Sequence, residues 1–199
     1  MNNPLQKNLV IFASGAGSNA QNIINYYREN HRIKIALIVC NNPKAGVIDI
    51  AAKEKIPILM ITKNEFLQTG YLQNIQEYHP DLIILAGFLW KIPEVLIASF
   101  PQKIINIHPA LLPAHGGKGM YGDRVHNAVI SAKEKQSGIT IHYVDEKYDN
   151  GKIIYQEHCD VTEEDTVESL SNKIHKLEHE FYPKAIDQLL YEKNPQFFS

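Results

Sequence analysis

Short apolar runs alternate with amphipathic stretches along the first half of the chain. Continuous runs of β-branched and apolar residues predict strands, and apolar residues at every third or fourth position predict helices. The predicted strands are Asn8–Ala13, Lys34–Cys40, Pro57–Ile61, Asp81–Ala86 and a fifth strand into which Lys103–Ile107 leads. The predicted helices are Ala20–Glu29, Ala45–Lys55, Asn64–Tyr78 and Pro93–Phe100, the last with proline in its first turn.

This alternation predicts an α/β fold with a doubly wound, mostly parallel sheet. The run Asp81–Ala86 is apolar throughout, which is typical of a parallel strand that helices cover on both faces. Ligands of such sheets bind beyond the carboxyl ends of the strands. The segments Ser14–Asn19, Ala86–Trp90 and Asn106–Pro109 adjoin the ends of predicted strands, so we expect them on one functional rim.

The pattern changes after Pro113. A glycine-rich loop at Ala114–Gly122 precedes a predicted helix, two further strands joined by a charged loop, and a long closing helix; these elements are Asp123–Glu134, Gly138–Asp145, Lys152–Cys159 and Asp165–Leu190. The spacing of the two strands suits a hairpin, which predicts an antiparallel C-terminal strand. The chain has neither repeats nor a low-complexity linker, so we expect a single domain over residues 1–199.

Composition narrows the classes of partner. With 44% hydrophobic residues and a formal charge of -2, the chain suits one compact domain and gives no reason to expect nucleic acid or an anionic membrane. The polar segment Met1–Lys7 lacks the apolar region of a signal peptide, and no apolar run reaches the ~20 residues of a membrane helix. Cys40 and Cys159 form no framework of cysteines, which fits a reducing compartment. We therefore expect a cytoplasmic protein.

The segment Ser14–Asn19 (SGAGSN) joins a predicted strand to a predicted helix. Its glycines allow close approach of the backbone to a ligand, and the helix start offers free N–H groups and a positive dipole end. This combination predicts a phosphate site, with a tight ligand-free turn as the alternative. Ala20 replaces the third glycine of a dinucleotide fingerprint, and the second strand ends in Cys40-Asn41-Asn42 without a carboxylate, so NAD is not expected.

Asn106 and His108 can present an amide and an imidazole to one point, because residues two apart in an extended segment share a face. Such a pair suits an oxyanion that develops on a carbonyl carbon. A lone histidine there is more often a structural residue. However, Asp149 lies in a loop between two later strands, and an acid beside an imidazole fixes its orientation and stabilises its charged form. The three side chains are our candidate catalytic group.

The sequence resembles the folate-dependent glycinamide ribonucleotide formyltransferases along almost its whole length. The resemblance rests on five blocks in the same order and spacing: SGAGSN (Ser14–Asn19), LAGFLWKIP (Leu85–Pro93), INIHPALLP (Ile105–Pro113), SGITIHYVDEKYDNGKII (Ser137–Ile154) and LEHEFYP (Leu177–Pro183). It implies transfer of formyl from 10-formyltetrahydrofolate, as cosubstrate, to the amine of glycinamide ribonucleotide in purine biosynthesis. It also implies a Rossmann-like formyltransferase fold, with residues 1–101 as the phosphate-binding half and residues 102–199 as the catalytic and folate-binding half.

The resemblance also assigns residues to roles. Asn106, His108 and Asp149 match the catalytic group, and Glu178 matches the acid that binds the ribose hydroxyls. The substrate phosphate falls on Gly17, Ser18 and Asn19. The folate falls on Asn106 and two backbone segments, whose residues are Leu89, Trp90, Lys91, Ile92, Asp145, Glu146, Lys147, Tyr148 and Asp149. We expect no metal to be required, and we expect a monomer or homodimer.

Two parts of the chain depart from the commoner family pattern. The segment Ala114–His126 is longer and richer in glycine, and the sequence gives its Lys118 and Tyr121 no role. Trp90-Lys91 replaces a more usual Met-Arg or Leu-Arg pair, which leaves the contact of Lys91 with the folate open.

Four other functions compete with this prediction. His175-Lys176-Leu177-Glu178-His179 matches a zinc-peptidase pattern, with polar helix residues as the plainer interpretation. A formyltetrahydrofolate hydrolase shares the Asn-x-His block, as does a transfer-RNA formyltransferase, although both usually carry an extra domain. A non-catalytic nucleotide-binding module would explain Ser14–Asn19 but not the Asn106, His108 and Asp149 group.

Overall fold

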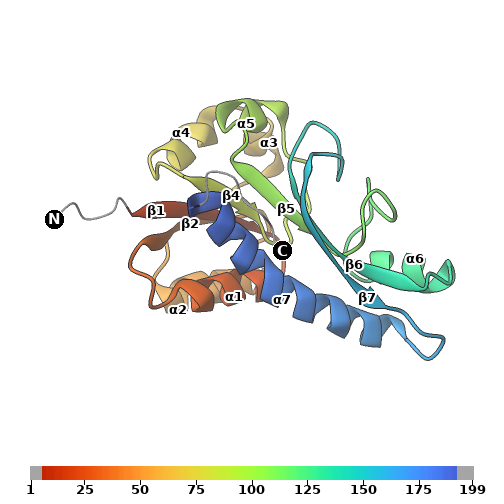
Figure 1. The fold of residues 1–199 in the computed structure, drawn as a ribbon. Coiled ribbons are helices and arrows are strands. Elements are labelled where there is room, and N and C mark those ends of the chain that lie inside the picture. Colours follow the sequence, from red (N-terminus) through yellow and green to blue (C-terminus); the bar gives the residue numbers. More distant parts are fainter. Residues whose placement is uncertain (1–5, 192–199) are drawn as a thin grey trace. The chain divides into compact units, whose positions relative to one another are not determined.

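A computed structural model describes residues 6–191 of the chain (Figure 1). The chain divides into two compact units, Met1–Ile105 and Asn106–Ser199. The predicted halves meet at residues 101 and 102, close to this division. Among the described residues, no helix has the length and apolar character needed to cross a membrane.

The first unit alternates strands and helices. Its elements are β1 (Lys7–Ala13), α1 (Ser18–Tyr27), β2 (Ile33–Cys40), α2 (Val47–Glu54), β3 (Ile58–Met60), α3 (Lys63–Phe66), α4 (Gly70–Gln76), β4 (Leu82–Leu85) and α5 (Glu94–Ser99). The strand β5 (Ile104–His108) crosses the boundary between the units. All strand pairs of β1 to β4 are parallel: β1 with β2, β1 with β4, and β2 with β3.

Helices cover both faces of these parallel strands. Figure 1 shows α1 and α2 on one face, and α3, α4 and α5 on the other. Consequently Leu9, Val10, Ile11, Phe12 and Ala13 of β1 are all fully buried, as expected for a strand covered on both sides. Because β1 has β2 on one side and β4 on the other, the winding reverses between β1 and β4. Open α/β sheets bind ligands at such a reversal.

Local capping corrects two predicted helices. The single helix predicted at Asn64–Tyr78 is two helices. Thr62 and Glu65 form a capping box that starts α3, the chain leaves the helix after Phe66, and α4 starts at Gly70. Pro93 is the N-cap of α5, in extended conformation, rather than a residue of its first turn. A third correction concerns Asn106 and His108, which lie within β5 instead of after it.

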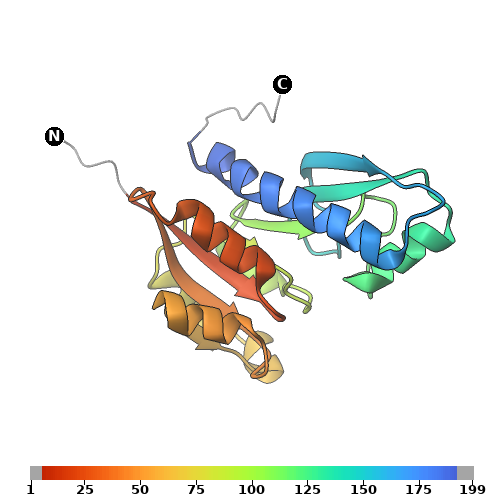
Figure 2. The ribbon, with the colours of Figure 1, turned by 90° about the horizontal axis from the view of Figure 1, so that it is seen from below.

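The second unit contains the end of β5, followed by α6 (Asp123–Ser131), β6 (Gln136–Tyr143), β7 (Ile153–Asp160) and α7 (Val167–Tyr191). Figure 2 shows α7 running along β6 and β7. The two strands pair antiparallel, as predicted. Gly138 of β6 has no room for a side chain, because a Cβ atom would lie 1.9 Å from the Glu157 carbonyl oxygen.

Within residues 6–191 the strands form one seven-stranded sheet in the order β3-β2-β1-β4-β5-β6-β7. Its parallel part and its antiparallel end at β6 and β7 confirm the predicted fold class: α/β, doubly wound, mostly parallel, with an antiparallel C-terminal strand.

Candidate active site

Asn106 and His108 lie on the same side of β5, because alternate residues of a strand share a face. The His108 side chain is only 3% exposed, whereas Asn106 is partly exposed. Regular strand geometry therefore brings an amide and an imidazole together, as the sequence predicted.

The imidazole of His108 is engaged at both nitrogens. Its Nε2 lies 2.9 Å from the carbonyl oxygen of His115. A carbonyl can only accept a hydrogen bond, so Nε2 carries a proton. The other nitrogen, Nδ1, lies 3.6 Å from Oδ2 of Asp149. The Asp149 carboxylate thus adjoins the ring at the nitrogen opposite the one that donates to the His115 carbonyl.

Asp149 lies in the loop between β6 and β7 and approaches His108, as the sequence predicted. Its Oδ2 accepts a hydrogen bond from the backbone N–H of Gly117 at 2.9 Å. Its φ of 51° is in the left-handed region, which aspartate tolerates better than most residues. The turn ends at Gly151, where a Cβ atom would lie 1.7 Å from the Tyr143 carbonyl oxygen, so only glycine fits.

His142 of β6 joins this group, although the sequence analysis gave it no role. It is 2% exposed, and its Nε2 lies 3.1 Å from Nδ2 of Asn106. The same nitrogen lies 3.8 Å from Oδ1 of Asp149. Thus one carboxylate has an imidazole on each side. One signal in the sequence could have indicated this: Thr140 and His142 alternate with Ile139 and Ile141 along β6, so the two polar side chains share a face.

Side chains of β6 and β7 form hydrogen bonds with the backbone of the turn that follows His108. The buried hydroxyl of Thr140 donates to the Ala110 carbonyl at 2.7 Å and accepts from the Leu112 N–H at 2.9 Å. The amide of Gln156 donates to the Leu112 carbonyl at 3.0 Å and to the Thr140 hydroxyl at 2.8 Å. The peptide bond before Pro113 is cis. These bonds satisfy the polar backbone of a buried turn and so fix the chain next to His108.

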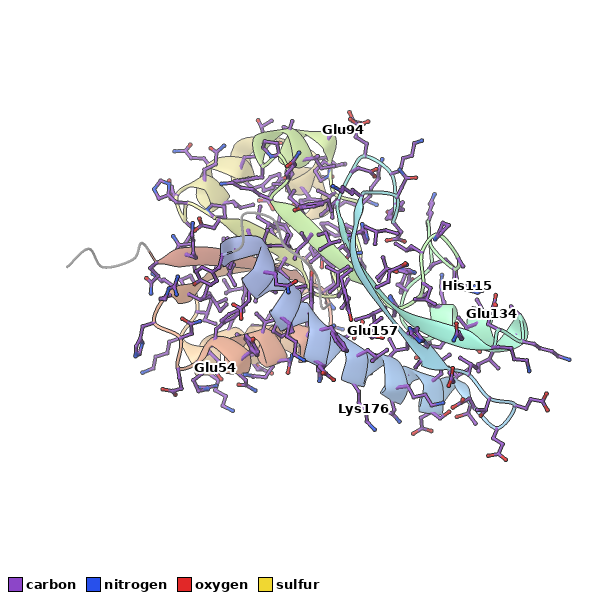
Figure 3. All side chains as sticks on the ribbon, in the orientation of Figure 1. Glu54, Glu94, His115, Glu134, Glu157 and Lys176 are labelled. Atoms are coloured by element: carbon purple, nitrogen blue, oxygen red, sulfur yellow. The ribbon has the colours of Figure 1, made fainter. Side chains whose placement is uncertain are left out.

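The glycine-rich segment Ala114–His126 supplies two backbone contacts to the same group. The His115 carbonyl accepts from His108, and the Gly117 N–H donates to Asp149. The His115 side chain pairs with Glu134 at 3.1 Å, and Figure 3 shows these two side chains next to one another. The segment to which the sequence gave no role therefore contacts two of the candidate catalytic residues.

The predicted phosphate segment lies at the reversal of winding in the first unit. The Ser14 N–H donates to the Gly87 carbonyl at 3.1 Å, and the Ser14 hydroxyl accepts from the Leu89 N–H at 3.0 Å. These two hydrogen bonds connect the loop after β1 to the loop after β4. Gly17, with φ 85°, is the N-cap of α1, and no side chain caps this helix start. The first turn of α1 contains Ser18, which is exposed, and Asn19, which is partly buried.

The predicted folate segments differ in exposure. Leu89 is 49% exposed, whereas Ile92 is buried. The Trp90 ring packs against Phe66 and Phe88, at centroid distances of 5.7 and 6.1 Å. In the other segment the Asp145 carboxylate accepts from the Lys147 N–H and the Asn150 amide, both at 2.9 Å, which shapes the loop that ends in Asp149. The side chains of Lys91, Glu146, Lys147 and Tyr148 are exposed.

Glu178 lies on α7 and is 5% exposed. Its Oε2 lies 3.0 Å from Nδ1 of His175, and this hydrogen bond raises the pKa of His175. His126 is almost fully buried, and burial lowers its pKa while the Glu178 charge opposes the shift. Within the described part of the chain, no three His, Cys, Asp or Glu side chains are grouped to hold a metal ion. His175 and Glu178 thus pair with each other, which gives the zinc-hydrolase alternative no support.

Residues 7–186 match the formyl transferase family, and the chain belongs to that family.

Individual relatives carry a more specific name. The chain is 38% identical to the phosphoribosylglycinamide formyltransferase of Bacillus subtilis (strain 168) over 190 residues, which is 92% of this chain and 95% of the relative. It is 37% identical to the chloroplastic phosphoribosylglycinamide formyltransferase of Arabidopsis thaliana over 197 residues, 96% of this chain and 68% of the relative. The crystal structure of the phosphoribosylglycinamide formyltransferase from Bacillus halodurans matches with a TM-score of 0.85 at 34% identity, over 97% of this chain and 100% of that one.

Proposed function

We propose that this formyl transferase moves the formyl group of 10-formyltetrahydrofolate to the amine of glycinamide ribonucleotide, a step of purine biosynthesis. One observation carries the proposal: Asn106 and His108 share a face of β5, and Nδ1 of His108 lies 3.6 Å from Asp149. The names of the relatives support the same acceptor, which is also called phosphoribosylglycinamide.

In the proposed reaction the amine nitrogen attacks the formyl carbon, and the carbonyl oxygen becomes an oxyanion. The Asn106 amide and protonated His108 stabilise this charge by donating hydrogen bonds. Asp149 holds the His108 ring and takes up the proton that the attacking amine releases, through water. The carbon–nitrogen bond to the folate then breaks, and the folate nitrogen takes a proton in return, so no charge accumulates.

Other residues would bind the phosphate and the ribose of the acceptor. We propose that Gly17, Ser18 and Asn19 hold the phosphate, because an uncapped helix start next to a left-handed glycine is suited to an anion. Glu178 would accept hydrogen bonds from the ribose hydroxyls.

The pterin would pair with backbone groups of Leu89, Trp90, Lys91 and Ile92 and of the loop from Asp145 to Asp149. The backbone N–H and C=O groups of two loops suit the amide-like edges of that ring. We further expect a cytoplasmic enzyme that works as a monomer or homodimer without a metal.

The experiment is an assay of purified protein with 10-formyltetrahydrofolate and glycinamide ribonucleotide, which follows both folate absorbance and formylated product. We expect turnover that requires the acceptor. In His108→Ala, kcat should fall by about 10²–10³-fold, because a donor to the oxyanion is lost. The matched control is His158→Ala, whose side chain on β7 is 62% exposed and should leave kcat unchanged.

The assay distinguishes a formyl transferase from a formyltetrahydrofolate hydrolase and tests the role of His108. Folate consumed at the same rate without the acceptor would identify a formyltetrahydrofolate hydrolase instead. Equal activity of His108→Ala and the wild-type protein would remove His108 from the chemistry.

A further inference from the structure

The hydrogen bonds of His142 define which of its nitrogens carries the proton. Nδ1 lies 2.8 Å from the carbonyl oxygen of Tyr143. Since a carbonyl can only accept, the proton of the neutral ring is on Nδ1, and Nε2 presents a lone pair. The group that faces this lone pair, at 3.1 Å, is the side-chain amide of Asn106. The nitrogen of that amide must therefore point to His142, because its oxygen would meet a second lone pair.

The surroundings of His142 keep the ring neutral. Burial is the largest influence and lowers the pKa of His142 below its ordinary value. The hydrogen bond to Tyr143 and the carboxylates of Asp149 and Asp145 oppose this shift, and a charged His108 adds to it. The net direction is downward, so His142 is neutral at neutral pH and still presents its lone pair to Asn106.

We propose that neutral His142 is a positioning residue that fixes the orientation of the Asn106 amide. One N–H of Asn106 is held by the Nε2 lone pair of His142, which leaves the second N–H of the same nitrogen free for the developing oxyanion. This inference rests on the proposed function, in which Asn106 is a donor to that charge. It adds a fourth side chain to the candidate group, one that acts through Asn106 and not on the substrate.

Protonation of His142 would reverse the arrangement. Nε2 would then carry a hydrogen and would face an amide that also presents hydrogens. Either the bond breaks, or the amide turns over to present its oxygen to His142. In the second case the nitrogen, and with it the donor for the oxyanion, moves to the opposite side of the Asn106 side chain. A displacement of this kind, about 1 Å or more, can cost roughly 10²-fold in rate.

The test compares two variants of the full chain in the assay described above. In His142→Leu no acceptor remains for Asn106, and we expect kcat to fall about 10²-fold while KM for both substrates changes little. In His142→Gln the side-chain oxygen can accept from Asn106 and has no proton to gain. We expect kcat of the wild-type enzyme to fall at acid pH as His142 takes up a proton. We expect His142→Gln to recover most of kcat and not to show that fall. His158→Gln, the same change at an exposed position of β7, is the matched control.

Two kinetic results would overturn the proposal. One is an equal loss of kcat in the leucine and glutamine variants, which would indicate a packing role. The other is an acid limb in His142→Gln that is identical to that of the wild-type protein.

Nitrogen NMR of the histidine rings supplies a readout that does not depend on activity. At neutral pH the His142 signal, assigned by its loss in His142→Gln, should show the tautomer with the proton on Nδ1. A proton on Nε2 would refute the inference even in an active enzyme. Conversely, the absence of formyl transfer by the wild-type protein would refute the proposed function. The position of the ring proton would even then test whether His142 accepts a hydrogen bond from Asn106.

Discussion

Two histidines flank the Asp149 carboxylate, and their hydrogen bonds give them different roles. His108 donates from Nε2 to the His115 carbonyl, so its other nitrogen can bond to Asp149 only when the ring is charged. His142 donates from Nδ1 to Tyr143 and accepts from Asn106, which requires a neutral ring. At the scale of single residues, the carbonyl of His115 in a loop and that of Tyr143 at the end of β6 thus fix which nitrogen of each ring donates.

A second residue-scale feature is the lack of space at Gly17. A Cβ atom there would lie 2.9 Å from Cδ1 of Ile50 and 3.0 Å from Cβ of Val47, with φ at 85°. For Gly17→Ala we expect the free energy of unfolding to fall by about 1–2 kcal/mol from the left-handed backbone alone. We also expect KM for glycinamide ribonucleotide to rise about tenfold, which corresponds to ~1.4 kcal/mol of binding.

Steady-state kinetics and urea unfolding measure both effects of Gly17→Ala. Gly15→Ala is the control, because its Cβ atom would meet nothing within 4 Å. If Gly15→Ala raised KM as strongly as Gly17→Ala, the crowding at Gly17 would not be the cause.

Sequence reasoning reached some of these residues and not others, for a physical reason. Asn106 and His108 are two positions apart in one strand, so their shared face follows from local geometry. His142 is on another strand, and its pairing with Asn106 depends on how β6 aligns with β5, which no local pattern encodes. The tautomer also depends on a single backbone carbonyl, that of Tyr143.

At the scale of elements, the turn that follows β5 is held by side chains of β6 and β7. Thr140 and Gln156 bond to the backbone of Ala110 and Leu112, at positions where all these groups are buried or partly buried. The hairpin therefore does more than extend the sheet, because it fixes the main chain that leaves His108.

Removal of the Thr140 hydroxyl tests this connection. In Thr140→Val the buried N–H of Leu112 and carbonyl of Ala110 lose their shared partner, so we expect the free energy of unfolding to fall by about 1–3 kcal/mol. Because the turn adjoins His108, kcat should fall as well. Urea unfolding and the formyl transfer assay give the two values. Thr140→Ser keeps the hydroxyl and should retain most of the stability and most of kcat. Equal losses in the serine and valine variants would contradict the explanation.

Most elements could be predicted from the pattern of apolar positions, because strands covered on both faces are apolar throughout. The errors occur where capping overrides that pattern. The region predicted as one helix breaks between Phe66 and Gly70, after the short helix that the Thr62 and Glu65 capping box starts. Pro93 is an N-cap in extended conformation and lies outside α5. Lys133 adopts a φ of 53°, so α6 ends at Ser131 and not at Glu134. Each of these depends on the backbone conformation of one or two residues.

At the scale of the whole molecule, the order of strands and helices specifies the fold class, and the sequence contained that order. The pattern of apolar positions did not indicate the division into two units, which falls inside β5, between Ile105 and Asn106. Only the family resemblance implied two halves, which meet at residues 101 and 102. A boundary within a strand leaves no glycine-rich or polar linker in the sequence to indicate it.

The stability of the whole chain should depend on pH through Asp165. This carboxylate is 5% exposed and accepts from Lys173 at 2.7 Å, from the Thr162 N–H at 2.8 Å and from the Ser169 hydroxyl at 2.7 Å. The hydrogen bond from Lys173, above all, holds the pKa of Asp165 well below its usual range. A depressed carboxyl pKa stabilises the folded state above the unfolded pKa, and this contribution is lost as pH falls towards the folded pKa.

For Asp165→Asn we therefore expect a loss of about 1–2 kcal/mol at pH 7, from weaker hydrogen bonds to a neutral side chain. The difference from the wild-type protein should narrow below about pH 4, where the Asp165 carboxylate of the unfolded chain begins to take up a proton while that of the folded chain stays charged. Urea unfolding over a series of pH values measures this. Glu163→Gln, at a side chain that is 91% exposed, should show no such trend. A difference that stays constant from neutral to acid pH would exclude the charge of Asp165 as its cause.

The left-handed backbone of Asp149 also determines how its role in the reaction can be measured. Alanine in that conformation carries a strain of about 1–2 kcal/mol, whereas asparagine tolerates it nearly as well as aspartate. An alanine scan would thus add the cost of a distorted turn to the loss of a carboxylate, and would overstate the chemical importance of Asp149. Asp149→Asn keeps the turn and removes only the charge, so it is the substitution that measures the contribution of the carboxylate charge.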